Sequence, residues 1–213
     1  MPKSYGQLVP SVARRLSAWV SISEQHAGAE SPSSHPTITL SRRFGCEAFP
    51  LSECLKDTLE SRTGRAWNIY DRALLERVAE DEHLSLKLLQ DLGGPSRAGD
   101  AIGFLFQDHH RHNAMFRQVA RHVLRLAETG NAIIVGRGGA IITQQLSNCY
   151  HFRLDAPFEF RVSSMARRLE IPEAEAVRMV RQEDKVREKL IEECLHASVS
   201  DIATWHTADT ESS

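Results

Sequence analysis

The chain has 213 residues, enough for one α/β domain of ordinary size and a small appendage. Apolar residues make up 41% of it and charged residues 25%, a composition typical of a soluble globular protein, and no apolar run is long enough to cross a bilayer. Lysine and arginine number 26 against 28 acidic residues, so the charge balance argues against general nucleic-acid binding.

The cysteines and the amino terminus bear on the compartment. The chain has four cysteines, Cys46, Cys54, Cys149 and Cys194. Their wide spacing, with no Cys-x-x-Cys pair, favours reduced thiols over disulfides or a zinc site. The first arginines lie inside an amphipathic pattern and precede no apolar segment, so the start of the chain does not resemble a secretory signal. We therefore expect a cytoplasmic protein that does not associate with membranes and has no metal site formed by its own side chains.

Residues 1–36 are predicted to form an N-terminal extension. Apolar residues recur at helical spacing between Val9 and Val20, which predicts an amphipathic helix over about residues 7–25. A polar linker containing prolines follows at 28–36. The apolar face of this helix needs a cover, so we expect it to pack on the core or on a second copy of the chain.

From residue 37 onward, short apolar segments alternate with helical patterns. Strands are predicted at 37–41, 67–70, 131–135 and 150–154. Helices are predicted to begin at Pro50, near Ala73 and near Met115, and a densely charged helical region covers 157–195 with a break at 171–172. This alternation predicts a parallel sheet covered on both faces. Residues 198–213 show little periodicity.

A glycine–arginine turn follows the third predicted strand. The strand stops at Gly136, the chain presents Arg137, and a helix begins on the glycines from Gly138. Open α/β sheets bind ligands at the carboxyl ends of their strands. The planar guanidinium suits a phosphate or carboxylate, because it donates two parallel hydrogen bonds. The alternative is an ordinary surface arginine at a strand end.

The loop at residues 41–50, between the first strand and the next helix, lies where a phosphate-binding loop belongs. In such a loop, backbone N–H groups and the helix N-terminus face the anion. The usual pattern has a second glycine, a lysine and a hydroxyl residue in succession, but this chain has Glu47, Ala48 and Phe49 there. By the motif alone this is a plain strand–helix connection, in which the charge of Glu47 would repel a phosphate.

The charged region at 157–195 holds arginines that can converge on a phosphoryl group. The candidates are Arg161, Arg167, Arg168, Arg181 and Arg187, together with Asp184. Arg181, Asp184 and Arg187 are three residues apart and share one helix face. Converging arginines stabilise the charge of a transferring phosphoryl group. Glutamates are interleaved with them, so the alternative is a solvated pair of helices held by salt bridges.

Three other patterns are less informative about function. Asp71 ends the second strand, where it can cap the next helix or accept a hydrogen bond from a base or a hydroxyl. Arg117, Arg121 and Arg125 form a stripe that is either a solvated face or an RNA contact. The histidine-rich segment 108–112 lacks partners at metal-ligand spacing and is interpreted as a polar helix start.

In this order and spacing, the segments resemble the cytidylate kinase-like family, within the P-loop nucleoside monophosphate kinases. The matching segments are Ile38-Thr39-Leu40-Ser41-Arg42-x-Phe44-Gly45, Tyr70-Asp71-Arg72 with Leu74-Leu75-Glu76, Leu126-Ala127-x-x-Gly130-Asn131-Ala132-Ile133-Ile134-Val135-Gly136-Arg137-Gly138, Leu154-x-Ala156-Pro157-x-Glu159-x-Arg161-Val162, and Asp184-Lys185-x-Arg187-Glu188. The resemblance covers about residues 37–195. The family continues past this region into a fifth strand and a closing helix, whereas this chain stops soon after Trp205 and His206, so the resemblance implies a sheet that is one strand short or a truncated chain.

The resemblance implies a P-loop kinase-like α/β fold with a helical lid, and transfer of a phosphoryl group from ATP, with Mg²⁺, to a pyrimidine nucleoside monophosphate. By position, it places Arg137, its flanking glycines and Asp71 at the monophosphate. It places the five arginines and Asp184 of the charged region in the lid or its hinge. Ser41, Arg42, Arg43, Gly45 and Cys46 would border the donor phosphates.

The chain departs from the family in this loop, since it has Gly45-Cys46-Glu47-Ala48 where relatives often carry Gly-Ser-Gly-Gly. One hypothesis is a phosphotransferase in which Arg42 and Arg43 replace the charge of the missing lysine. A second is a catalytically degenerate relative that binds a nucleotide or a protein partner. A third hypothesis, which has the least support, is an RNA-associated module that uses the Arg117 stripe. The N-terminal helix or an exposed sheet edge would allow homo-oligomers.

Overall fold

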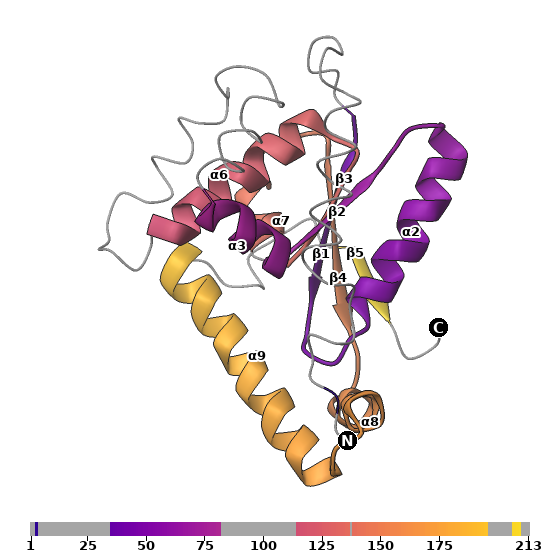
Figure 1. Cartoon of the computed structure of the whole chain (residues 1–213), viewed down its shortest axis with the longest axis vertical. Helices are drawn as coiled ribbons and strands as arrows, with labels where there is room; N and C mark the ends of the chain where they lie inside the picture. The colour runs from indigo at the N-terminus through magenta and orange to yellow at the C-terminus, as the bar shows by residue number, and fades with distance from the viewer. Residues whose placement is uncertain (1–2, 4–34, 82–113, 137, 196–205, 210–213) are drawn as a thin grey trace.

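The computed structural model describes residues 3, 35–81, 114–136, 138–195 and 206–209 (Figure 1). The elements in chain order are β1 (Thr37–Arg42), α2 (Ala48–Thr63), β2 (Asn68–Asp71), α3 (Arg72–Glu80), α6 (Ala114–Thr129), β3 (Ala132–Val135), α7 (Gly139–Ile142), β4 (Cys149–Asp155), α8 (Phe158–Leu169), α9 (Glu173–Leu195) and β5 (His206–Asp209). The predicted helix at 7–25 and the segment 108–112 lie outside the described residues.

The strands form one sheet in the order β2-β3-β1-β4-β5, and every neighbouring pair is parallel. Helix α2 covers one face, and α3, α6 and α7 cover the other (Figure 1). The predicted α/β architecture is therefore confirmed. The sequence analysis missed β5, which pairs with β4 inside the stretch without periodicity, so the expected loss of a last strand is wrong. None of the helices within the described ranges is long and apolar enough to span a membrane.

The central strand β1 is buried on both faces, which explains its β-branched and apolar composition. Ile38 and Leu40 face α2 and pack in a core with the completely buried Trp67. Thr37 and Thr39 face the other way. The Thr37 hydroxyl donates to a carbonyl of α6 at 3.1 Å, and the Thr39 hydroxyl pairs with a ring nitrogen of His151 on β4 at 2.8 Å. These bonds satisfy the polar groups that the sheet buries.

The charged region forms two helices, α8 and α9, as the break at residues 171–172 predicted. Helix α8 ends at Glu170, which adopts a left-handed conformation, and Pro172 follows shortly afterwards. The two helices enclose a separate hydrophobic core, which contains Phe44 from the loop between β1 and α2. Helix α9 leaves this core and runs toward α3 and α6 (Figure 1), where Leu190 and Ile191 pack against the core under those helices.

Candidate functional site

A cleft of about 670 Å³ lies between the carboxyl edge of the sheet and α9. The ends of β1, β3 and β4 form one wall, together with the first residue of α3, and α9 forms the opposite wall. Seven residues predicted from the sequence line it: Ser41, Arg42, Arg43, Gly136, Gly138, Asp184 and Arg187. The cleft therefore lies at the edge of the sheet where the sequence placed a ligand.

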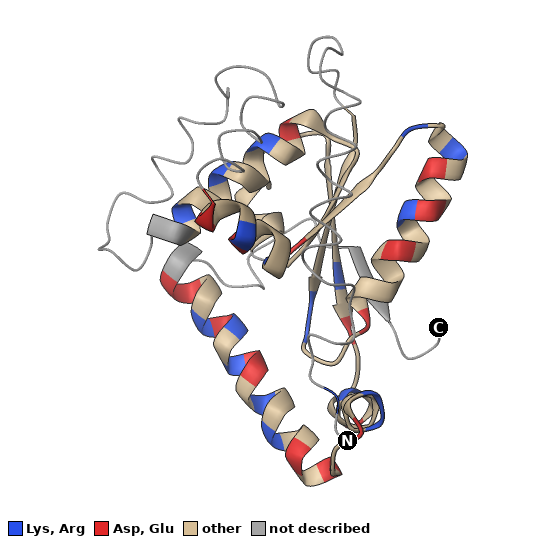
Figure 2. Ribbon diagram, viewed as in Figure 1, with Lys and Arg blue, Asp and Glu red and all other residues tan. Residues whose placement is uncertain are grey.

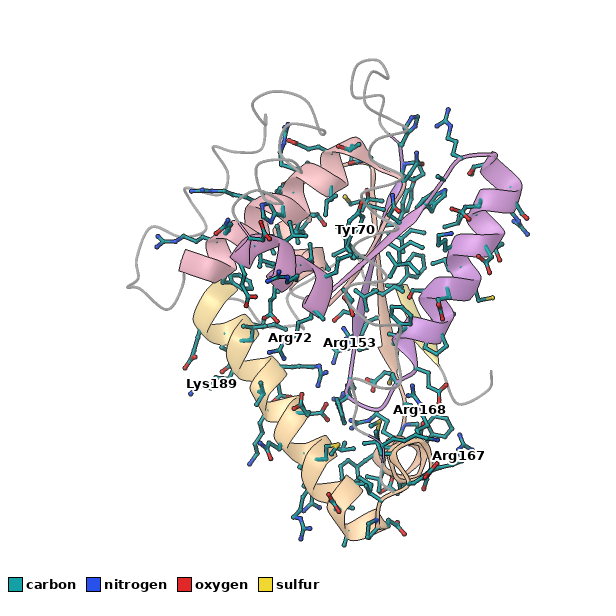
Figure 3. All side chains as sticks on the ribbon, viewed as in Figure 1. Tyr70, Arg72, Arg153, Arg167, Arg168 and Lys189 are labelled. Carbon is teal, nitrogen blue, oxygen red and sulfur yellow. The ribbon has the colours of Figure 1, made fainter. Side chains whose placement is uncertain are left out.

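Other predicted residues do not line the cleft. The first loop keeps Gly45 and Cys46 buried, and α8 carries Arg161, Arg167 and Arg168. Figure 3 shows Arg167 and Arg168 at α8, whereas Arg72 and Arg153 lie between the sheet and α9. The side chain of Arg181 on α9 stacks over the ring of Phe158, with the guanidinium carbon 5.4 Å from the ring centroid. Arg137 lies outside the described residues.

Asp71 is the N-cap of α3, and its Oδ1 accepts a hydrogen bond from the Leu74 N–H at 3.0 Å. The capping interpretation of Asp71 is thus confirmed, because one of the helix's otherwise unpaired N–H groups is satisfied. Asp71 itself is not among the residues that line the cleft, but its neighbour Arg72 is.

The two walls of the cleft differ in charge. Every charged residue on the sheet wall is an arginine: Arg42, Arg43, Arg72 and Arg153. Helix α9 contributes Arg187 and Lys189, but it also contributes all of the acidic lining residues, and Figure 2 shows acidic and basic residues alternating along it. An anion in the cleft would therefore gain most by lying against the strand ends.

Several of these cations already have carboxylate partners. The Arg43 Nε lies 3.3 Å from Asp155 Oδ1, and the Arg72 Nε lies 3.1 Å from Glu76 Oε2. On α9, Arg187 pairs with Glu183 at 3.4 Å and Lys189 pairs with Glu193 at 3.4 Å, each pair being one helical turn apart. Within the part of the chain that the structure describes, Arg42 and Arg153 form no ion pair or hydrogen bond through their side chains.

Several backbone N–H groups of the first loop, residues 43–47, and that of Ala48 at the start of α2 donate within the protein. The Phe44 N–H donates to Asp184 Oδ1 at 3.0 Å, the Cys46 N–H to the Arg43 carbonyl at 3.3 Å, and the Ala48 N–H to the Cys46 carbonyl at 2.9 Å. Gly45, with φ +95°, packs directly on α8, so that a β-carbon there would lie 2.8 Å from Cβ of Arg161. The loop is therefore folded against α8, and these three N–H groups do not form an open cradle for an anion.

Glu47 is the N-cap residue of α2, but its side chain caps nothing. Its Oε1 instead accepts a hydrogen bond from the Ser164 hydroxyl at 3.1 Å and lies 3.7 Å from Arg168 Nε, both on α8. The charge predicted to repel a phosphate is thus directed toward α8 and partly balanced by an arginine.

A buried ion pair between Arg161 and Asp184 holds the loop between the two helices. Arg161 is 1% exposed, and its Nη1 donates to Asp184 Oδ2 at 2.7 Å and to the Phe44 carbonyl at 2.8 Å. Its Nε donates to the Ala156 carbonyl at 3.1 Å. Asp184 also accepts from the Phe44 N–H, so both polar groups of one backbone residue are bonded to this pair. In this conformation Arg161 faces the loop and not the cleft.

Arg187 joins the same cluster from the cleft side. Its guanidinium carbon lies 4.9 Å from the centroid of the Phe44 ring, a geometry that permits a cation–π contact. Arg187 lines the cleft and is half-buried. The three residues predicted to share one helix face, Arg181, Asp184 and Arg187, therefore do not all have the same neighbours. Asp184 and Arg187 face the loop and the cleft, whereas Arg181 packs on Phe158.

Sequence reasoning missed Arg72, Arg153 and Lys189 as cleft residues. Arg153 was interpreted only as part of a strand, although a charged residue next to the buried Leu154 near the end of that strand was an available signal. The stripe at Arg117, Arg121 and Arg125 is not one solvated face, because Arg125 is buried and pairs with Glu128 at 3.2 Å. The cleft nevertheless lies at the edge of the sheet where the sequence predicted a ligand.

A parallel sheet with a charged cleft at its carboxyl edge has the arrangement in which open α/β folds bind ligands, and the family match supports a kinase-like nucleotide-binding fold. The chain belongs to the cytidylate kinase-like family, whose sequence model matches residues 37–208. No match to a curated protein was found.

The solved structures that are similar to the chain include the following two proteins. An uncharacterized protein from Eubacterium ventriosum ATCC 27560 is 16% identical with a TM-score of 0.59, over 82% of this chain and 89% of the other. TT1252 from Thermus thermophilus is 18% identical with a TM-score of 0.45, over 82% of this chain and 88% of the other. The first of these supports the fold assignment.

Proposed function

We propose that this chain is a nucleotide phosphotransferase that transfers the γ-phosphate of ATP to a pyrimidine nucleoside monophosphate. The observation that carries the proposal is the cleft, where the arginine-lined strand ends face a helix with Asp184 and Arg187. Phosphoryl transfer requires two polyanions to be brought together and their charge to be neutralised, with little covalent help from the protein. Membership in the cytidylate kinase-like family supports the reaction class.

The acceptor is proposed to bind at the glycine–arginine turn. Gly136 and Gly138 line the cleft, and Arg137 between them is the residue that the family resemblance assigns to the monophosphate. Arg187 is the α9 residue best placed to contact a transferring group, because it lines the cleft and is held against Phe44. Arg161 would act indirectly in this scheme, as a positioning residue that fixes Asp184 and the loop.

Mg²⁺ is proposed to enter with the nucleotide. Across the residues that the structure describes, no group of three or more His, Cys, Asp or Glu side chains is arranged to hold a metal ion. Mg²⁺ is commonly bound through one or two protein oxygens and the substrate phosphates. The Ser41 hydroxyl and the α9 carboxylates Glu188 and Glu192 line the cleft and are the oxygen donors available there.

A second candidate is a relative that binds a nucleotide without transferring phosphate. The state of the first loop favours it, because the N–H groups of Phe44, Cys46 and Ala48 are bonded within the protein. The family's lysine position also holds Ala48, so no ammonium group reaches the donor phosphates from this loop. Under this alternative the cleft would hold one nucleotide, and no donor site would form beside it.

The two candidates are separated by assaying the purified chain with ATP, Mg²⁺ and each of CMP, dCMP and UMP, with the nucleoside diphosphate as the measured product. The proposal predicts turnover that Arg137→Ala abolishes. The matched control is Arg62→Gln, which removes one positive charge from the exposed end of α2 on the other face of the sheet. No turnover, together with a melting temperature that CMP raises, would establish the second candidate instead.

A further inference from the structure

The carboxylate of Asp184 fills a small anion-binding position between the first loop and α8. Its Oδ1 accepts a hydrogen bond from the Phe44 N–H at 3.0 Å, and its Oδ2 accepts one from Nη1 of Arg161 at 2.7 Å. The two oxygens of one anion therefore meet a backbone donor and a guanidinium donor. Backbone N–H groups and guanidinium groups are also the donors that bind phosphate oxygens in proteins. The position has the chemistry of a phosphate site, but a side chain of the protein occupies it.

The buried charge of Arg161 requires an anion at this position. Arg161 is 1% exposed, and among the described residues Asp184 is the carboxylate that pairs with it. Its other hydrogen bonds go to the carbonyls of Phe44 and Ala156, which do not neutralise its charge. Removing the partner of a buried charge is strongly destabilising, because the charge is left without compensation. Asp184 can therefore leave Arg161 at low cost only when another anion takes its place.

Asp184 is also the point at which this buried pair meets the cleft. Its side chain is 21% exposed, and it lines the cleft together with Arg187, whose guanidinium lies against the Phe44 ring. Asp184 belongs to α9, which forms one wall of the cleft, whereas Phe44 belongs to the first loop and Arg161 to α8. A movement of α9, or a change of the Asp184 rotamer, would withdraw the carboxylate and free both donors for an anion that enters from the cleft.

We propose that Asp184 is an internal anion that closes the donor-phosphate site, and that a phosphate group of the nucleotide displaces it. The inference rests on the proposed function in taking the donor nucleotide as the ligand. Exchange of one anion for another keeps the buried Arg161 compensated, while the Phe44 N–H and the Arg161 Nη1 pass from the carboxylate to phosphate oxygens. The closed state raises the apparent dissociation constant for polyphosphate, because only the molecules that are open can bind it. The Asp184 contact is therefore autoinhibitory.

The test measures the binding of inorganic pyrophosphate to the full chain by titration calorimetry and does not depend on turnover. Asp184→Ala vacates the position, and Asp184→Asn keeps the volume of the side chain but removes its charge. Both variants are expected to bind pyrophosphate about threefold more tightly or better, which corresponds to a site that is closed in about two-thirds of the wild-type molecules. The matched control is Glu175→Gln, which removes an exposed carboxylate from the first turn of the same helix and should leave the affinity unchanged.

Melting temperatures separate this contact from a purely structural ion pair. Asp184→Ala should melt below the wild-type chain when no anion is added, and both acetate and pyrophosphate should raise its melting temperature more than that of the wild type. A purely structural pair predicts the loss of stability without tighter pyrophosphate binding, and that result would overturn the autoinhibitory contact. Rescue by acetate but not by pyrophosphate would also overturn it, because the vacated position would then admit a carboxylate and no phosphate group.

The asparagine variant keeps the proposal testable if the alanine variant does not fold, because the binding measurement needs only one of them. Wild-type turnover to a nucleoside diphosphate, with no gain of pyrophosphate affinity in the variants, would retain the proposed function and overturn the autoinhibitory contact. Tighter pyrophosphate binding by the variants of a chain that makes no diphosphate would retain the contact and overturn the proposed phosphoryl transfer.

Discussion

The first loop and the neighbouring ends of β1 and β4 lie at the same edge of the sheet, but their polar groups have different partners. In the loop, the Phe44 N–H and carbonyl are both bonded to the buried Arg161–Asp184 pair. At the strand ends, the guanidinium groups of Arg42 and Arg153 line the cleft without a carboxylate partner among the described residues. The comparison indicates that changes in the loop should affect stability first, whereas changes at the strand ends should affect ligand binding first.

The largest expected effect comes from breaking the buried pair that holds the loop. Arg161→Met leaves Asp184 and the Phe44 carbonyl without their partner, and we expect a loss of about 3–5 kcal/mol in the free energy of unfolding, measured by urea denaturation. The control is Lys189→Met, which breaks an exposed pair on α9 and should cost less than about 1 kcal/mol. A double variant, Arg161→Met with Asp184→Leu, should regain part of the loss. Equal effects of the two single variants would contradict the comparison.

A pH-dependent loss of stability is expected from a histidine far from the strand ends in sequence. Burial, with a smaller contribution from the Arg121 charge, lowers the pKa of His122 to about 4. In the unfolded chain this histidine takes up a proton near pH 6.5, whereas in the folded chain it does so only near pH 4. The free energy of unfolding is therefore unaffected by His122 above about pH 6.5 and decreases as the pH falls from there toward 4. The loss should reach about 3 kcal/mol at most.

Urea denaturation at several pH values between 4 and 7.5 measures this effect. His122→Gln should flatten the dependence across that window. The CMP phosphate itself titrates near pH 6, so the pH dependence of CMP affinity is compared between the wild-type chain and His122→Gln. A difference between the two would show that the core and the strand ends are not independent.

Close packing of the loop on α8 gives the next effect. At Gly45 an alanine would place its β-carbon 2.8 Å from Cβ and 3.0 Å from the carbonyl oxygen of Arg161, at a φ of +95°. We expect Gly45→Ala to cost about 2–3 kcal/mol in thermal or urea unfolding, from strain and overpacking together. Gly64→Ala is the matched control, since its φ is +65° and its β-carbon would meet nothing within 4 Å, so it should cost about 1 kcal/mol.

The smallest expected effect is at the N-cap of α2. Replacing Glu47 with glycine removes a negative charge from a helix N-terminus, where the helix dipole favours anions, and should tighten ATP binding a few-fold, corresponding to about 0.3–1 kcal/mol. Glu47→Gln should give a similar gain while keeping the side-chain length. Calorimetry with ATP and Mg²⁺ measures both variants. Unchanged or weaker ATP affinity would show that the donor phosphates do not lie at this helix.

Local pattern was sufficient for most of the fold. Strands β1 and β3 and the break before Pro172 could be predicted from composition, because burial on both faces and the loss of a backbone donor act locally in sequence. The two other predicted strands, β2 and β4, are shorter apolar stretches that are only partly buried. Strand β5 could not be predicted, since His206-Thr207-Ala208-Asp209 has no apolar alternation. Its register, with His206 level with Phe152, is set by pairing with β4, which local sequence does not encode.

The site divides in the same way. Ser41, Arg42 and Gly136 could be placed together because the carboxyl ends of parallel strands meet at one edge. The position of Arg161 was predicted, but its partners were not, since the Phe44 carbonyl that it contacts is 117 residues away in the chain. Whether an arginine faces a ligand or a backbone carbonyl depends on the packing of α8 against the loop, which spacing along α8 does not reveal.

The attachment of Phe44 to Asp184 has a mechanical consequence. Helix α9 carries one wall of the cleft, and the same helix holds the main chain of residue 44 through Asp184 directly and through Arg161. A rotation of α9 that widened the cleft would either break these hydrogen bonds or move residue 44 together with the helix. The gap between the walls and the shape of the loop therefore change together, and amide hydrogen exchange at residue 44 would report both.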